Sequence, residues 1–160
     1  MLRTSTSAGY SRNDLLAILR LAGPGALLGA LVGFPLGEFA FAHPSPHPIE
    51  AAAILAILGA CVGGALTRLR PLPVTFAVST VVAGIAIAGG FAGATVTLWA
   101  MSAYALFTGQ MPFFGLGFRL EIDLPFLGEY GNEAVVVAGA LAGGWWLLRR
   151  VARWVARDVL

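Results

Sequence analysis

The sequence predicts an all-α integral membrane protein, a bundle of four transmembrane helices with both termini on the cytoplasmic side. Of its 160 residues, 58% are hydrophobic and only 11% are charged. The mean hydropathy of +0.83 lies outside the range of soluble globular domains. The length corresponds to one domain, and the placement of the arginines predicts the orientation of the bundle.

The first predicted span covers residues 21–42, which are apolar except for Glu38. Ser11 and Asp14 have the spacing of a capping box, so a helix can begin just before the span. A cleaved signal peptide is the alternative, because residues 40–42 have the small-x-small form of a cleavage site. The apolar run exceeds the roughly 7 to 15 residues of a signal-peptide core, which favours a retained span.

The second predicted span covers residues 49–67 and follows the connection HPSPHP at residues 43–48. The three prolines of this connection are incompatible with a helix and favour an extended outer loop. Pro48 fits the first turn of the helix that follows. Arg68 and Arg70 then form a short basic turn on the inner side.

The third predicted span, residues 74–107, is too long for one perpendicular crossing and short for two. A turn at Gly89 and Gly90 would export the four arginines that follow residue 148, against the positive-inside tendency. One long span instead leaves nine of the ten arginines on the inner side. A re-entrant segment over residues 91–107 is the remaining alternative.

The fourth predicted span covers residues 134–154 and follows an outer loop at 108–133. Within this loop, residues 118–124 alternate apolar and charged side chains, which predicts a small extended element at the outer surface. The apolar part of the last span measures only about 22 Å, so its arginines must snorkel to the inner headgroups. The predicted lipid anchors are basic and aromatic: Trp145, Trp146, Arg149, Arg150, Arg153, Trp154 and Arg157.

Glycines at a spacing of four are the most specific pattern. Gly25, Gly29, Gly33 and Gly37 lie on one face of the first span and form a glycine zipper. Shorter versions in the other spans are the pairs Gly59 and Gly63, Gly89 and Gly93, and Gly139 and Gly143. Helices in lipid associate through the close backbone approach that small residues permit. The pattern fits internal packing of a monomeric bundle, self-association, or docking onto a larger complex.

Four titratable side chains around the first hairpin are the candidates for ion or proton handling: Glu38, His43, His47 and Glu50. A carboxyl group at membrane depth is costly and points to function. Glu38, however, lies about 27 Å along the helix from Arg20, close to the outer headgroups. A stiff exposed loop with incidental histidines explains the remaining residues, so no metal site is predicted.

No enzymatic constellation is present in the sequence. A nucleophile with a base, a phosphate-binding loop and a histidine within a span for haem are all missing, so neither catalysis nor a cofactor is predicted. The single cysteine, Cys61, excludes an internal disulfide. Because the arginines flank apolar segments, they indicate lipid anchoring and not nucleic-acid binding. Ten arginines without a single lysine favour a high-GC bacterial source.

The expected function is therefore helix-mediated assembly, with the lipid bilayer and other membrane subunits or further copies of the chain as partners. The protein would be a small accessory subunit of an inner-membrane complex or a homo-oligomer. The alternative is a small ion or solute transporter or channel, with Glu38 and the first outer hairpin at its mouth. A holin-like or membrane-stress protein is a third reading.

Polar side chains of the third span either line a path or bond to their own backbone: Ser79, Thr80, Thr95, Thr97, Ser102 and Tyr104.

Overall fold

The computed structural model describes residues 11–40, 47–68, 72–108 and 131–157. Their regular structure is entirely helical, and all four helices are long and apolar enough to cross a membrane, which confirms the predicted all-α, four-helix part of the fold class, while the orientation stays a prediction. The helices are α1 (Arg12–Ala40), α2 (His47–Leu66), α3 (Leu72–Phe107) and α4 (Gly131–Arg157). The extended element predicted at residues 118–124 lies outside the described residues.

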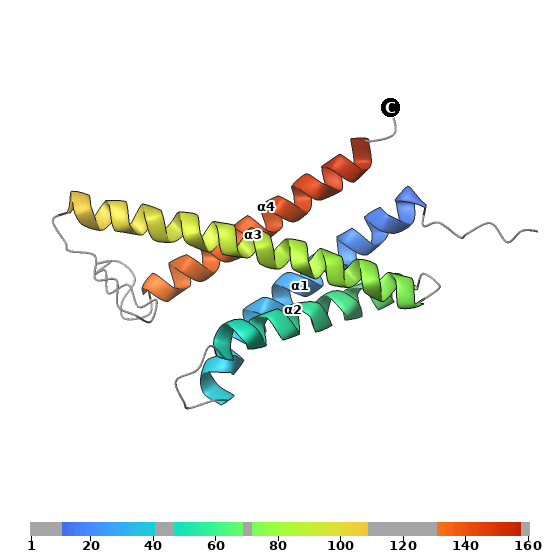
Figure 1. The fold of residues 1–160 in the computed structure, drawn as a ribbon, viewed down its shortest axis with the longest axis horizontal. Helices are drawn as coiled ribbons and strands as arrows, with labels where there is room; N and C mark the ends of the chain where they lie inside the picture. Colours follow the sequence, from blue (N-terminus) through green and yellow to red (C-terminus); the bar gives the residue numbers. More distant parts are fainter. Residues whose placement is uncertain (1–10, 41–46, 69–71, 109–130, 158–160) are drawn as a thin grey trace, which may run out of the picture.

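Consecutive helices run antiparallel, and the bundle consists of two hairpins (Figure 1). The most extensive contact is between α1 and α2, and the next is between α3 and α4. The hairpins meet where α3 packs against α1 and α2 and where α4 packs against α1. Within the described residues α2 and α4 do not contact each other. The first hairpin is therefore joined to the second through three of the four possible helix pairs.

Local hydrogen bonds and backbone conformation fix two of the helix ends. The Ser11 amide donates to the Asp14 carboxylate at 2.9 Å, and the Asp14 amide donates to the Ser11 hydroxyl at 3.2 Å. This reciprocal pair confirms the predicted capping box and starts α1 well before its apolar run. After α2, Arg68 adopts the left-handed conformation with φ of 57°, which terminates a helix.

The third helix is continuous. It has 36 residues and passes through Gly89 and Gly90 without a turn, so residues 91–107 extend the helix and do not form a separate re-entrant segment. At 1.5 Å per residue α3 is about 54 Å long, against a hydrocarbon core of roughly 30 Å. Even when tilted by about 40° from the bilayer normal, the upper end of the usual range, α3 would extend about 41 Å along that normal. Part of α3 must therefore extend beyond the hydrocarbon.

The core is built mainly from alanine. The main cluster draws on all four helices and contains Ile18, Ala22, Ala26, Ala60, Val82, Ala83, Ala86 and Leu148. A second, smaller cluster around Met101 and Ala105 is packed by Leu98, Val135 and Val136. It therefore involves α3 and α4 alone. Small side chains in the main cluster bring the helix backbones close together.

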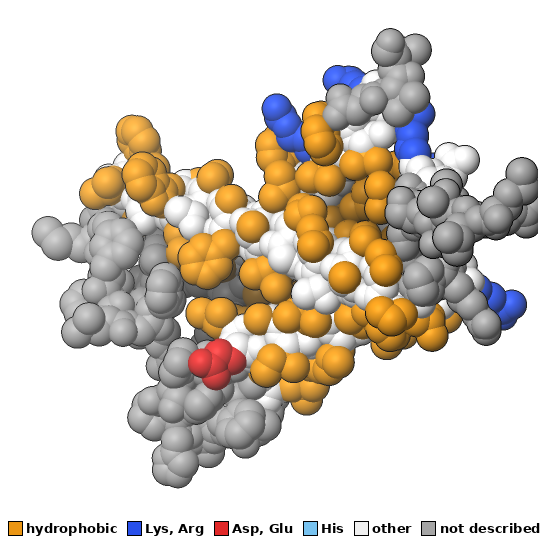
Figure 2. Space-filling model, turned by 45° about the vertical axis from the view of Figure 1, so that its right-hand side comes forward, with side chains coloured by type: hydrophobic (Ala, Val, Ile, Leu, Met, Phe, Trp, Pro, Cys, Tyr) orange, Lys and Arg blue, Asp and Glu red, His pale blue; other side chains and the backbone are white. Residues whose placement is uncertain are grey.

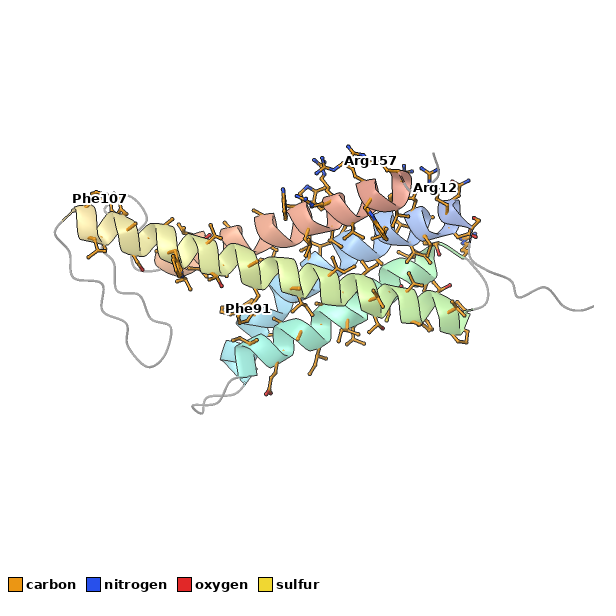
Figure 3. The ribbon with its side chains drawn as sticks, turned by 45° about the horizontal axis from the view of Figure 1, so that its top comes forward. Arg12, Phe91, Phe107 and Arg157 are labelled. Atoms are coloured by element: carbon orange, nitrogen blue, oxygen red, sulfur yellow. The ribbon has the colours of Figure 1, made fainter. Side chains whose placement is uncertain are left out.

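The two ends of the bundle differ in charge. Arg12 and Arg157 lie at the same end, and Phe107 lies at the opposite end (Figure 3). The surface between the ends is largely hydrophobic, with basic side chains gathered at its margins (Figure 2). The end of α2 and the start of α3 lie at the same end of the bundle as the start of α1 (Figure 1), and Arg68 follows the last residue of α2 by two positions. This asymmetry provides the basis for assigning an orientation.

Replacing Ser11 by Ala should loosen the first turn of α1, because the Asp14 amide loses the hydroxyl that it bonds. The expected cost is about 1 kcal/mol, which corresponds to about fivefold faster amide exchange in that turn. Hydrogen exchange of the detergent-solubilised protein, followed by mass spectrometry, measures the rate. Ser102→Ala is the control, because the Ser102 hydroxyl bonds within its own helix. Equal exchange in Ser11→Ala and the wild type would contradict the role of the cap.

Candidate functional site

The glycine face of α1 lies directly against the backbone of α2. A Cβ atom on Gly29 would lie 2.6 Å from the carbonyl carbon of Leu55, and one on Gly33 would lie 2.6 Å from the carbonyl oxygen of Ala51. Real Cβ atoms essentially never approach other atoms within 3.0 Å. Because the opposing atoms belong to the backbone, alanine at either position would push the two helices apart.

The glycines of α2 meet α1 in the same way. A Cβ atom on Gly59 would lie 2.9 Å from the carbonyl carbon of Gly25, and one on Gly63 would lie 2.7 Å from the carbonyl carbon of Leu21. The contact is therefore formed by glycines of both helices. Gly37, the last member of the predicted zipper, lies in α1 outside the part of that helix whose surroundings are described.

Glycines also close the hairpin of α3 and α4. A Cβ atom on Gly89 would lie 2.7 Å from the carbonyl oxygen of Gly143, and one on Gly93 would lie 2.9 Å from the Cα atom of Gly143. A Cβ atom on Gly139 would lie 2.9 Å from the Cβ atom of Thr97. Each hairpin thus has an interface in which backbone packs on backbone or on a small side chain.

Two further close contacts join the hairpins to each other. A Cβ atom on Gly64 of α2 would lie 3.2 Å from the Cβ atom of Ser79 in α3, and one on Gly144 of α4 would lie 2.8 Å from Cδ2 of Leu27 in α1. Neither Gly64 nor Gly144 has another glycine four residues away, so the pattern of glycine pairs does not include them. Ala60 lies four residues before Gly64, so a pattern that accepts alanine as the second small residue would have found this contact.

The hydroxyl groups of α3 bond within their own helix. Each of five donates to the carbonyl oxygen four residues earlier, at 2.8 to 2.9 Å: Ser79, Thr80, Thr95, Thr97 and Ser102. For the five Ser and Thr residues this is the second of the two interpretations, a bond to their own backbone. Tyr104 is exposed on the same helix.

The last turns of α4 carry the predicted anchors on exposed positions. The guanidinium of Arg149 lies 4.8 Å from the centre of the Trp145 ring, and that of Arg150 lies 5.3 Å from Trp146. Both distances are those of cation–π pairs. The Nε group of Arg153 donates to the carbonyl oxygen of Arg149 at 3.4 Å.

The residues proposed for ion or proton handling fall largely outside the described side chains. Glu38 lies in the last turn of α1 and His47 at the start of α2, but their side chains are not described, and His43 lies outside the described residues. Glu50 is exposed in the first turn of α2. Among the described residues, no group of three or more His, Cys, Asp or Glu could hold a metal ion.

Gly29→Ala should lower the stability of the bundle, whereas Gly84→Ala should not. At position 29 the new methyl meets the α2 backbone, and the expected loss is about 1–3 kcal/mol. At position 84 a Cβ atom meets nothing within 4 Å, so stability is expected to stay equal or to rise by up to about 1 kcal/mol, because alanine favours helices. Denaturant titration in detergent micelles, followed by circular dichroism, measures both. Equal stability of the two variants would contradict the packing described for Gly29.

No model of a protein family, no curated protein and no solved structure matches this chain.

Proposed function

We propose that this chain is a non-catalytic membrane protein that acts through helix–helix assembly, as an accessory subunit of an inner-membrane complex or as a homo-oligomer. The arginine-rich end would face the cytoplasm, in keeping with the positive-inside tendency. The observation that carries the proposal is a face of small residues on α3 that the described part of the chain leaves uncovered. Gly84, Ala88 and Ala92 form this open face.

The open face differs from the other small-residue faces in what lies opposite to it. Gly84, Ala88 and Ala92 follow a spacing of four, and all three are exposed. Gly84 is the one described glycine at which a Cβ atom would meet nothing within 4 Å. On the other side of the same helix, Gly89 is in close contact with α4. The predicted zipper is already packed against α2 at Gly29, so a partner is better placed on the open face.

The chemistry of the open face suits another helix. A helix that packs there can approach the α3 backbone closely at Gly84 and meets only methyl groups at Ala88 and Ala92, gaining dispersion and weak Cα hydrogen bonds. Larger exposed side chains lie near the two ends of the face, with Val81 63% and Phe91 62% accessible. They would fix the register of an approaching helix, because its side chains must pack between them.

Gly84→Leu should weaken association while the bundle itself stays folded. A Cβ atom at this exposed position meets nothing within 4 Å, so the leucine can extend over the open face and the hairpins are expected to stay undisturbed. The expected loss of association is about 1–3 kcal/mol, the usual cost of overpacking. Native gels and chemical cross-linking in detergent measure the oligomer, and mass spectrometry identifies any subunit that co-purifies.

Val62→Leu is the matched control, since it enlarges a similarly exposed side chain on α2, outside the open face, and should leave association nearly intact. Unchanged association in Gly84→Leu, with a folded bundle by circular dichroism, would remove the open face as the site of assembly. Gly29→Leu is unsuitable for this test, because it would disrupt the packing of α1 on α2.

Transport is the competing function, and liposome flux separates it from assembly. In the transport hypothesis Glu38 carries the proton or ion, so Glu38→Gln should abolish flux that the wild type supports. From the assembly proposal we expect background flux of protons and divalent cations with both proteins. Flux that depends on Glu38 would overturn it in favour of a transporter.

A further inference from the structure

The outward side of the last three turns of α4 combines cations with aromatic rings. We call it the Arg–Trp stripe; its members are Trp145, Trp146, Arg149, Arg150, Arg153, Trp154 and Arg157. All seven are exposed, whereas Gly144 and Leu148 on the opposite side of the helix are buried against the other helices. Because α4 packs through its other side, the stripe is directed away from the bundle.

Two arginines of the stripe are held in place by their neighbours. Arg149 and Arg150 lie over the rings of Trp145 and Trp146, each one turn earlier in the helix. A guanidinium that stacks through its face still presents its N–H groups at the edge, in a planar fork that matches a phosphate. The stacking also reduces the entropy lost on binding, because the side chains are already ordered.

Among the described residues near the stripe, cations outnumber acids. Arg12, at the start of α1, contacts the carbonyl oxygen of Ala156 and so adds a cation beside the end of α4. Figure 3 shows Arg12 and Arg157 together at this end. The acid described there, Asp14, is engaged in the capping box with Ser11. This end of the bundle therefore attracts anions.

We propose that the Arg–Trp stripe binds an anionic phospholipid, with its headgroup phosphate on the guanidinium groups and its acyl chains against the tryptophan rings. The order of the groups along α4 favours a lipid over a soluble anion. Trp145 and Trp146 lie four residues, about 6 Å, closer to the middle of the span than Arg149 and Arg150. A phospholipid presents its apolar chains and its phosphate in the same order, whereas an acidic peptide would leave the rings unmatched.

Lipid selectivity tests the proposal, which does not depend on the proposed assembly. Full-length protein in detergent is mixed with equal amounts of phosphatidylglycerol and phosphatidylcholine, and native mass spectrometry counts the lipids retained. The wild type should prefer phosphatidylglycerol. The double variant Arg149→Gln/Arg150→Gln should lose about fivefold of that preference for each arginine removed. Arg20→Gln, which removes one exposed cation from α1 near the same end, should lose clearly less than either single variant, Arg149→Gln or Arg150→Gln.

Three outcomes would overturn the proposal. The first is an unchanged preference in the double variant when circular dichroism shows it folded. The second is a loss in Arg20→Gln equal to that of either single variant, which would trace the selectivity to net charge alone. The third is displacement of phosphatidylglycerol by excess inorganic phosphate or an acidic peptide, which would point to a soluble partner. Arg149→Lys/Arg150→Lys keeps the charge without the planar fork and should show an intermediate preference; full retention would exclude recognition of the phosphate by the planar fork.

Discussion

The close approach of helix backbones at glycine is the constraint on which this structure depends. Lipid chains are as apolar as the side chains, so burial supplies little force between helices, and contact must come from near-touching backbones. Gly29 and Gly33 bring α1 onto α2, while Gly89 and Gly143 bring α3 onto α4. The alanine-rich core follows from the same requirement, because a bulky side chain between the helices would separate the faces that the glycines bring together.

The features that depend on local patterns could be predicted from the sequence. Hydrophobic run length predicts the four helices, and the Ser11 and Asp14 spacing predicts the start of α1. The spacing of four also identified glycines of both hairpin interfaces, although it could not say which helix each would meet. The continuity of α3 could be predicted only from the distribution of the arginines, because no residue near Gly89 and Gly90 distinguishes a turn from a straight helix.

Features that depend on how the helices pack against one another could not be predicted from the sequence. Whether a small residue is covered or open depends on which side of its helix meets a neighbour. Gly84 and Gly89 lie in the same uncharged stretch of sequence but have opposite surroundings. Likewise the arginines near the end of α4 were expected to extend toward the headgroups, but the stacking of Arg149 on Trp145 was not foreseen. Predicting such a stacked pair requires the rotamers of both side chains, which composition and spacing do not specify.

The absence of contact between α2 and α4, among the described residues, bears on biogenesis. Within this part of the chain, α2 packs against α1, which precedes it, and α3, which follows it directly. Its packing therefore does not require α4. The hairpin of α1 and α2 can close as soon as both have entered the bilayer, while α3 is still being synthesised. In contrast, α4 must find both its hairpin partner and the first helix, so its insertion completes the bundle.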